Sequence, residues 1–434
     1  MDLGGWDDTD SDAAIHAVRN GHLRVVSPSE RADDWREYLH YQDSKGGKPK
    51  LSKHLANATA VLRYHPQWKG KICFDEHAIR ELVLAPPWHE AEAGGSSGEW
   101  REWTDKDDSR LSSWLLRELG LELSPDACLR GVGVAADANR IHPFRDWLDG
   151  LTWDGVDRLD CWLMDHLGVV PSPYVALAGK WWMVALAARI YRPGCKADYV
   201  LVLEGKQGLK KSTALKTLAG ERYFSDTPIR IGNKDAYLAL PGRVIIELAE
   251  FKLDSKAAKD FFSSAVDRYR PPFGRREISV PRSCGFASTI NPEGSGAYLT
   301  DETGGRRFWP VECGEINLAG LAAAREQLWA EAATRFKAGE RWWPDTPEEH
   351  DLFTEEQAQR TEGEPWAEPI EAWLALHPGE VTPNEVLMGA VGLSKEKIGR
   401  VEQRRAMRVL RELKYRQVQF REGASRVRKY VKGT

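Results

Sequence analysis

Cysteine is scarce in this sequence: six residues are spread over 434 positions, and no C-x-x-C pair exists among them. The spacing offers no zinc knuckle, so reduced thiols in a cytoplasmic protein are the simplest expectation. Long apolar runs are also missing, because the longest, Trp181 to Ile190, is shorter than the ~20 residues that a membrane span needs. The first residues are acidic and argue against a signal peptide. We therefore predict a soluble intracellular protein with no membrane partner.

No single sign of charge dominates, because 61 Lys and Arg residues are balanced by 65 Asp and Glu residues, for a net charge of −4. Bulk charge thus predicts no polyanionic partner. The distribution is uneven, however: fourteen basic residues stand against four acidic ones between Lys395 and Thr434, so that segment carries +10 and the remainder −14. A basic tail on an acidic chain indicates a local DNA contact or, alternatively, a module that docks on an acidic protein.

The patterning changes along the chain. Helical periodicity dominates from about residue 51 to 195, and short β-type runs then alternate with helical stretches, as in an α/β domain with a parallel sheet. Tyr199–Leu203, Val244–Ile246 and Cys284–Thr289 are the clearest predicted strands. Most of the tryptophans precede residue 200, and we expect them in hydrophobic cores rather than in base-stacking sites.

Length and composition allow several domains, since ~100–200 residues per domain is usual and 42% of the residues are hydrophobic. We predict a polar arm or linker (1–50), a helical N-terminal domain (51–195), an α/β core (196–320), a helical lid or linker (321–364) and a C-terminal domain (365–434).

The most specific motif is the loop Gly205-Lys206-Gln207-Gly208-Leu209-Lys210-Lys211-Ser212, which lies between an apolar strand and a helical pattern. This is the context of a P-loop, whose backbone N–H groups and helix N-terminus bind phosphates. Lys211 is predicted to neutralise the β and γ oxygens of ATP, and Ser212 to ligate Mg²⁺. The expected ATP-binding residues are Gly205, Gln207, Gly208, Leu209, Lys210, Lys211, Ser212 and Thr213.

Lys210 departs from the pattern G-x-x-x-x-G-K-[ST], which has glycine before the lysine. Its side chain either crowds the nucleotide or points outward and adds positive charge. The alternatives to an active site are a chance glycine turn and a degenerate P-loop that has lost hydrolysis. The flanking strand and helix favour nucleotide binding with hydrolysis.

Polar residues follow the next two predicted strands. Glu247 suits coordination of Mg²⁺ and Glu250 suits orientation of the attacking water. Asn291, at the tip of a strand between the nucleotide-binding strands, suits a contact to the γ-phosphate or to that water. Strands that end in Glu are common, and an Asn-Pro turn is the alternative for Asn291, so the order of the three motifs is what favours these roles.

Several segments beside the P-loop resemble the virulence-associated E family of phage, prophage and genomic-island proteins. The resemblance covers roughly residues 60 to 315 and is carried by His142–Leu148, Leu151–Leu159, Arg192–Asp198, Tyr269–Arg275 and Thr303–Val311. It implies a helicase superfamily 3-like AAA+ core. The tail, by its own pattern, predicts a winged helix: a helix at Ala367–Leu376, a basic helix at about Gly399–Leu413, and two strand-like runs at Gln417–Phe420 and Arg426–Val431. The fold class that we expect is multidomain α+α/β: a helical N-terminal region, an AAA+ P-loop α/β core and a C-terminal winged helix.

The resemblance also implies roles for individual residues. Lys211 and Ser212 would be the Walker A pair, Glu247 and Glu250 the Walker B acids, and Asn291 the sensor. Arg306 and Arg307 would include an arginine finger that reaches a neighbour's ATP, since adjacent arginines present a fork of donors to a γ-phosphate. The alternative is a surface arginine pair bound to carboxylates.

The partners that the resemblance implies are copies of the chain itself, in a ring that we expect to be a hexamer, and a separate primase. No primase-type acidic cluster is evident in the N-terminal region, so priming would come from another protein. Such a ring would act in the cytoplasm of a bacterial host on single-stranded and duplex DNA. The candidate DNA contacts are Arg270, Arg275, Arg276 and Arg282 in a turn-rich stretch, and Arg400, Arg404, Arg405, Arg408 and Arg428 in the tail.

We therefore predict an ATP-dependent DNA helicase or replication-initiator ATPase. The rival is a DNA-binding regulatory protein whose altered P-loop binds nucleotide only as an assembly switch. A small-molecule kinase would also have a P-loop, but it gives no reason for the basic tail.

Overall fold

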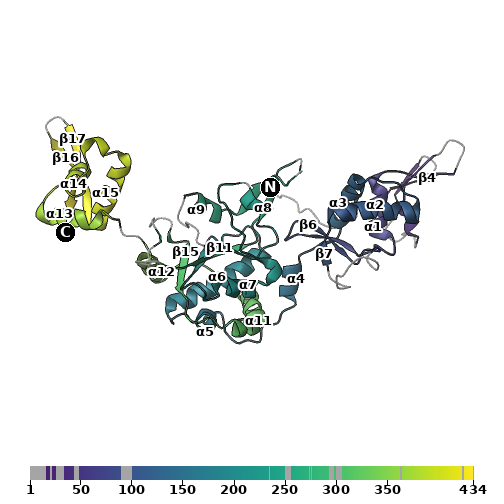
Figure 1. The fold of residues 1–434 in the computed structure, drawn as a ribbon, viewed down its shortest axis with the longest axis horizontal. Coiled ribbons are helices and arrows are strands. Elements are labelled where there is room, and N and C mark those ends of the chain that lie inside the picture. Colours follow the sequence, from purple (N-terminus) through teal and green to yellow (C-terminus); the bar gives the residue numbers. More distant parts are fainter. Residues whose placement is uncertain are drawn as a thin grey trace, which may run out of the picture.

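The computed structural model describes most of the chain, in three bodies that follow one another along its longest axis (Figure 1). The described residues are 34–43, 48–88, 100–233, 235–249, 256–272, 274, 276–292, 298–299, 305–361, 364–422 and 425–433, with the backbone of β1 (His16–Arg19) and β2 (His22–Val25). Within them, no helix is long and apolar enough to cross a membrane.

The N-terminal body packs helices on a sheet. Its four-stranded sheet has the order β7-β6-β5-β8. The strands are β5 (Ile72–Asp75), β6 (Arg80–Leu84), β7 (Trp100–Glu102) and β8 (Arg140–Ile141). The helices are η2 (Trp35–Tyr38), α1 (Leu55–Tyr64), α2 (Asp105–Leu119) and α3 (Pro125–Asp137), and a small ribbon is formed by β3 (Tyr41–Gln42) and β4 (Lys50–Leu51). The prediction of a helical region is thus wrong in part, because strands of two to five residues are too short to show a period-2 pattern.

The helices of this body cover an apolar core. Trp68 and Trp114 are buried in it, with ring centroids 5.7 Å apart. The expectation that tryptophans before residue 200 fill cores is confirmed for Trp35, Trp68, Trp114, Trp162, Trp181 and Trp182.

The central body holds a five-stranded sheet in which every neighbouring pair is parallel, in the order β10-β11-β14-β9-β15. The strands are β9 (Val200–Glu204), β10 (Phe224–Ser225), β11 (Ile245–Ala249), β14 (Gly285–Ile290) and β15 (Phe308–Glu312). The three clearest predicted strands correspond to β9, β11 and β14, to within about three residues at their ends. Parallel strands bring their carboxyl ends to one edge of the sheet, and that edge positions the candidate site.

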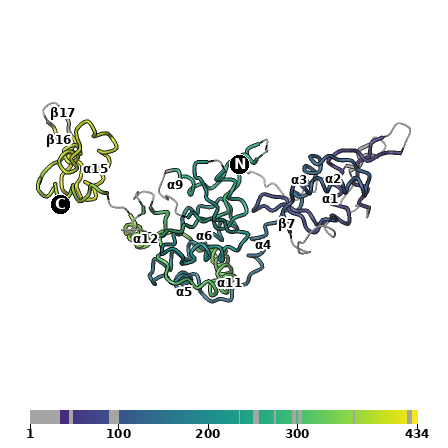
Figure 2. The backbone as a smooth tube through the Cα atoms, viewed as in Figure 1, coloured from purple at the N-terminus to yellow at the C-terminus, as the bar shows by residue number. Residues whose placement is uncertain are grey.

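Helices cover both faces of this sheet (Figure 1), and α9 (Lys256–Phe262) and α11 (Leu318–Lys337) lie at opposite sides of the central body (Figure 2). One face packs on α4 (Pro143–Asp149), α5 (Trp162–Leu167), α6 (Pro173–Tyr191), α7 (Lys211–Ala219), α11 (Leu318–Lys337) and α12 (Pro347–Gln359). The other face packs on α8 (Asp235–Leu238) and α9 (Lys256–Phe262). The predicted domain boundary at residues 195 and 196 falls inside the first of these cores, because α4, α5 and α6 share it with the sheet.

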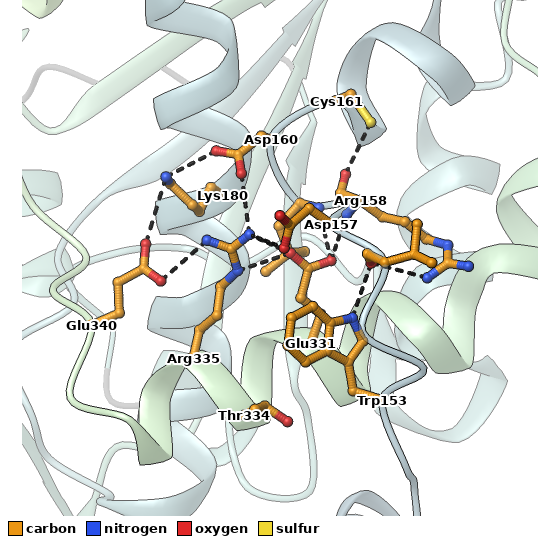
Figure 3. Close-up of polar contacts among 12 residues, drawn as sticks. Trp153, Asp157, Arg158, Asp160, Cys161, Lys180, Glu331, Thr334, Arg335 and Glu340 are labelled. Carbon is orange, nitrogen blue, oxygen red and sulfur yellow. Dashed lines mark hydrogen bonds and ion pairs between the residues drawn. The ribbon is translucent and has the colours of Figure 1, made fainter.

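The segment before α5 is hydrogen-bonded to α11, within the central body. The backbone N–H groups of Arg158 and Leu159 donate to Glu331 Oε2 at 2.7 and 3.0 Å. Figure 3 shows Arg335, one turn further along α11, among carboxylates that include Glu331 at 2.7 Å and Asp160 at 3.1 Å. Arg158 and Leu159 belong to the stretch 151–159 that resembles the family. Their contacts to Glu331 therefore have a structural role, because they hold α11 in place.

The turn between β5 and β6 docks the N-terminal body on the central body. Gly242 N–H donates to His77 O at 2.7 Å, and His77 Nε2 lies 3.1 Å from Arg243 O. The His77 ring stacks on His142 with centroids 4.9 Å apart. Burial lowers the pKa of His77 to about 3, and the charge of His142 acts in the same direction.

The C-terminal body consists of helices followed by a hairpin. Its elements are α13 (Ala367–Leu376), α14 (Pro383–Gly389), η5 (Lys395–Lys397), α15 (Arg400–Glu412), β16 (Tyr415–Glu422) and β17 (Ser425–Lys432). An isolated bridge from Val381 to Tyr430 holds the hairpin against the loop before α14. The predicted helices at 367–376 and 399–413 and the two predicted strand-like runs correspond to α13, α15, β16 and β17, to within a few residues.

Candidate functional site

The glycine-rich loop leaves β9 at the carboxyl edge of the sheet. Gly205 has φ +142°, and a Cβ there would meet Leu209 Cδ1 at 2.8 Å and Cys313 O at 3.2 Å. Gly208 also has a positive φ, +88°. The loop thus requires glycine at both positions, for backbone conformation and, at Gly205, for space as well.

Lys211 begins α7 and folds back over the loop. Its Nζ donates to Gly205 O at 2.6 Å, to Lys206 O at 3.0 Å and to Asn291 Oδ1 at 2.9 Å. Burial lowers the pKa of Lys211, while the nearby Glu247 carboxylate raises it. The ammonium group is therefore held at the mouth of the loop by three acceptors.

Lys210 has φ +65° and ψ +28°, the left-handed helical conformation that favours glycine. This geometry explains why the P-loop pattern has glycine here, and it costs an L-residue ~1–2 kcal/mol. The Lys210 side chain is exposed. Outward projection of this side chain, away from the nucleotide, stays a prediction.

Ser212 and Glu247 meet beside the loop, although they lie 35 positions apart. Ser212 Oγ donates to Glu247 Oε1 at 2.7 Å, and Thr289 Oγ1 donates to the same oxygen at 2.5 Å. Glu247 is 2% exposed, and its second oxygen, Oε2, is buried with no hydrogen-bond partner. An unpartnered carboxylate oxygen beside a hydroxyl fits a Mg²⁺ ion that takes its remaining ligands from phosphate and water.

Asn291 directly follows β14, which lies between β9 and β11. Its side-chain oxygen contacts Lys211, and the residue therefore lies at the edge where the loop and Glu247 meet. The structure thus brings together Lys211, Ser212, Glu247 and Asn291. Glu250 lies outside the described residues. Among the described residues, no group of three or more His, Cys, Asp or Glu side chains is arranged to hold a metal ion.

Arg306 and Arg307 lie at the opposite edge of the sheet from their own P-loop. They precede β15, whose first residue pairs with Val200, whereas the loop follows the last residue of β9. The length of a five-residue strand, roughly 17 Å, separates the two edges. Arg306 is exposed, whereas Arg307 Nε lies 3.5 Å from Asp198 Oδ2 and 2.9 Å from Ser263 Oγ.

A cavity of about 550 Å³ opens beside the first turn of the loop. Two residues at its wall were missed by sequence reasoning. Glu204, the last residue of β9, is 4% exposed and forms an ion pair with Arg360 at 3.0 Å. A lone acid at the end of an apolar strand was a usable signal for Glu204, but nothing in the sequence indicates a partner 156 positions away.

The predicted DNA contacts in the central body separate into two groups. Arg270 and Arg276 are exposed, at the end of the hairpin of β12 (Val266–Tyr269) and β13 (Ile278–Pro281), and Arg275 lies outside the described residues. Arg282 is 1% exposed, and its guanidinium pairs with Asp267, with Nε 3.0 Å from Oδ2. The prediction of a DNA contact at Arg282 is therefore wrong, because its charge is buried and already neutralised.

The predicted contacts in the C-terminal body also differ. Arg400, Arg404 and Arg428 are exposed. Arg408 Nε bonds to Glu412 Oε1 at 2.8 Å. Arg405 lies over the ring of Trp366, 3.6 Å from its centroid, and pairs with Glu364. Arg405 thus holds α15 to the start of this body, and DNA contacts at the exposed Arg400, Arg404 and Arg428 stay a prediction.

Comparisons with known proteins give one family match and two structural similarities. Residues 148–362 match the model of the virulence-associated protein E-like domain, which supports that family for this part of the chain. No curated protein matches. Two solved structures of the NrS-1 C-terminal region in its apo form are similar, at 13% and 14% identity with TM-scores of 0.45 and 0.44. Each match covers 83% of this chain and 96% of the other.

Proposed function

We propose that this chain is an ATP-dependent, ring-forming DNA helicase or replication-initiator ATPase of a phage or other mobile genetic element. The observation that carries the proposal is the convergence of Lys211, Ser212, Glu247 and Asn291 at one edge of a parallel sheet. The match to the virulence-associated protein E-like domain supports the link to mobile elements. The central body would be an AAA+ core and the C-terminal body a winged helix.

Each residue at this edge has a chemical role in the proposal. Lys211 binds the β and γ oxygens of ATP, and Asn291 orients the attacking water or the γ-phosphate. Ser212 and Glu247 would hold Mg²⁺, which draws electron density from the phosphate oxygens when bound. Glu250 keeps its predicted role as the residue that orients water. Attack on the γ-phosphorus forms a bond to the water oxygen and breaks the bond to the β–γ bridging oxygen.

The arginine that reaches a neighbour's ATP would be Arg306. The support is that Arg306 is exposed at the edge of the sheet away from its own loop, while Arg307 is engaged with Asp198. A residue so placed acts on a nucleotide only in another copy of the chain. The ATP site would then be complete only in an assembly of several copies of the chain. We propose that this assembly is a hexameric ring.

The two basic regions would have separate tasks. The hairpin that carries Arg270 and Arg276 would follow single-stranded DNA, and the exposed arginines of the C-terminal body would bind duplex DNA. Replacing Arg276 with Ala should impair ATPase stimulation by single-stranded DNA. Removing residues 366–434 should mainly weaken duplex binding. Unchanged duplex affinity in the truncated protein would argue against this division.

A steady-state ATPase assay with and without single-stranded DNA tests the proposal. Lys211→Ala should lower turnover by on the order of 10²-fold or more and weaken ATP binding, because it removes the cation that offsets the γ-phosphate. Lys216→Ala is the matched control, since Lys216 lies further along α7 and pairs with Glu221 at 2.6 Å. Wild-type turnover in the Lys211 variant would refute the P-loop assignment. ATP binding without turnover in the wild-type protein would favour the assembly switch.

A further inference from the structure

Glu204 places a carboxylate directly beneath the phosphate-binding loop. It ends β9, adjoins Gly205 and is 4% exposed. A buried carboxylate at this point would repel the phosphates of ATP unless its charge is neutralised, and buried charges are costly without a partner. The P-loop therefore depends on whatever neutralises Glu204.

Arg360 provides that neutralisation from the end of α12. Its Nε lies 3.1 Å from Glu204 Oε1, and its Nη2 lies 3.0 Å from Glu204 Oε2, so the pair is bidentate. The remaining nitrogen, Nη1, donates to Glu356 Oε2 and at 3.1 Å to Glu356 O, both on α12. The guanidinium group thus joins the last turn of α12 to the first residue below the loop.

Tyr298 completes this cluster. Its hydroxyl donates to Glu204 Oε1 at 2.7 Å, and the backbone N–H groups of Tyr298 and Leu299 both donate to Arg360 O at 2.9 Å. Tyr298 belongs to the connection between Asn291 and the arginines before β15. Arg360 is consequently fixed at both its side chain and its backbone, and its position relative to Glu204 is tied to that of α12.

We propose that Arg360 is a positioning residue for nucleotide binding. Through its ion pair with Glu204, it makes the affinity for ATP depend on the position of the C-terminal end of α12. The assignment rests on the proposed function, because it presumes that the loop binds ATP. Arg360 acts here on the charge and the geometry of the residue below the loop, and the effect needs no contact between Arg360 and phosphate. Displacement of α12 would unmask Glu204 and release nucleotide.

The test measures the affinity of the full-length protein for a fluorescent ATP analogue with Mg²⁺. Arg360→Gln should weaken binding by roughly tenfold or more, because it leaves the buried charge of Glu204 under the phosphates. The double variant Glu204→Gln with Arg360→Gln should recover affinity to within about threefold of wild type, since no unpaired charge remains. Arg360→Lys should lie between wild type and Arg360→Gln.

Arg341→Gln is the matched control. Arg341 pairs with Glu349 at 2.6 Å. Glu349 lies near the start of α12, at the opposite end of this helix from Arg360. It should lower thermal stability without changing nucleotide affinity. Wild-type affinity in folded Arg360→Gln, or no recovery in the double variant, would overturn the assignment alone. If Arg360→Gln does not fold, wild-type affinity in Arg360→Lys overturns it, and so does an affinity of the double variant more than about threefold below wild type. Absence of nucleotide binding by the wild-type protein would overturn the proposed function as well.

Discussion

Ser212 and Glu247 share a hydrogen bond of 2.7 Å across the carboxyl edge of the central sheet, between the first turn of α7 and the strand β11. The strand β14 separates β11 from β9, so α7 must cross over β14 for this contact to form. The contact also leaves Glu247 Oε2 without a partner. In the proposed site, this pair would hold Mg²⁺.

We expect Ser212→Ala to weaken ATP binding in the presence of Mg²⁺ and to have little effect in EDTA. The hydroxyl is a direct ligand in the proposed site, and its loss should cost roughly tenfold in affinity for the magnesium complex. Titration of a fluorescent nucleotide with and without Mg²⁺ measures the difference. An equal loss under both conditions would show that Ser212 supports the loop rather than the metal.

Arg306→Ala should lose ATPase activity in assembled protein while nucleotide binding by the single site survives. Mixing it with the inactive Lys211→Ala variant should restore part of the activity, because some interfaces then combine an intact loop with an intact arginine. Arg307→Ala should instead lower thermal stability, since Arg307 holds Asp198 and Ser263. No recovery in rings shown to be mixed would count against action between subunits.

Lys210→Gly should stabilise the protein by about 1 kcal/mol in chemical unfolding, because glycine adopts φ +65° without strain. Lys210→Ala removes the same charge but keeps the strained conformation, so it should not stabilise. Comparing the two variants separates backbone strain from electrostatics. Equal stability of the two would mean that relief of the left-handed strain does not exceed the extra conformational entropy that glycine gives the unfolded chain.

Arg400→Ala and Arg404→Ala should each reduce the slope of log affinity against log salt for duplex DNA by about one unit. Both side chains are exposed on α15. Arg405→Ala should mainly lower the melting temperature of the C-terminal body, because it removes the contacts to Glu364 and Trp366. A salt slope that does not change in the first two variants would remove α15 from the DNA interface.

Acidification should weaken the docking of the N-terminal body through His77. Its pKa is lowered to about 3 in the folded protein, while an unfolded histidine titrates near 6.5, so protons bind the unfolded state more strongly between those values. The free energy of unfolding should therefore fall as pH drops below 6.5, by up to roughly 1.4 kcal/mol per pH unit. His77→Gln should flatten this dependence, and His350→Gln, at an exposed position, should leave it unchanged.

The positions of Lys211, Glu247 and Asn291 could be predicted because Lys211 and Asn291 come after short apolar strands and Glu247 follows an apolar run within β11. Local sequence is enough to recognise these arrangements. The burial of Arg282 could not, since its partner Asp267 lies across a hairpin and a basic residue shows no sign of burial in sequence. The same holds for Arg360 and Glu204, which chain folding alone brings together. The packing of α6 on the central sheet could not be predicted either. A helix that is apolar on all sides is expected to be buried, but its sequence does not indicate what it packs against.

Because α6 fills the same core as the sheet, a fragment able to fold on its own does not begin at the phosphate-binding strand. A fragment that starts at residue 196 would lose α4, α5 and α6 from this core, and the apolar side chains that pack against them would be exposed to water. We expect such a fragment to aggregate. Limited proteolysis of the whole chain should instead yield a stable piece whose first residue lies before Pro143, where α4 begins.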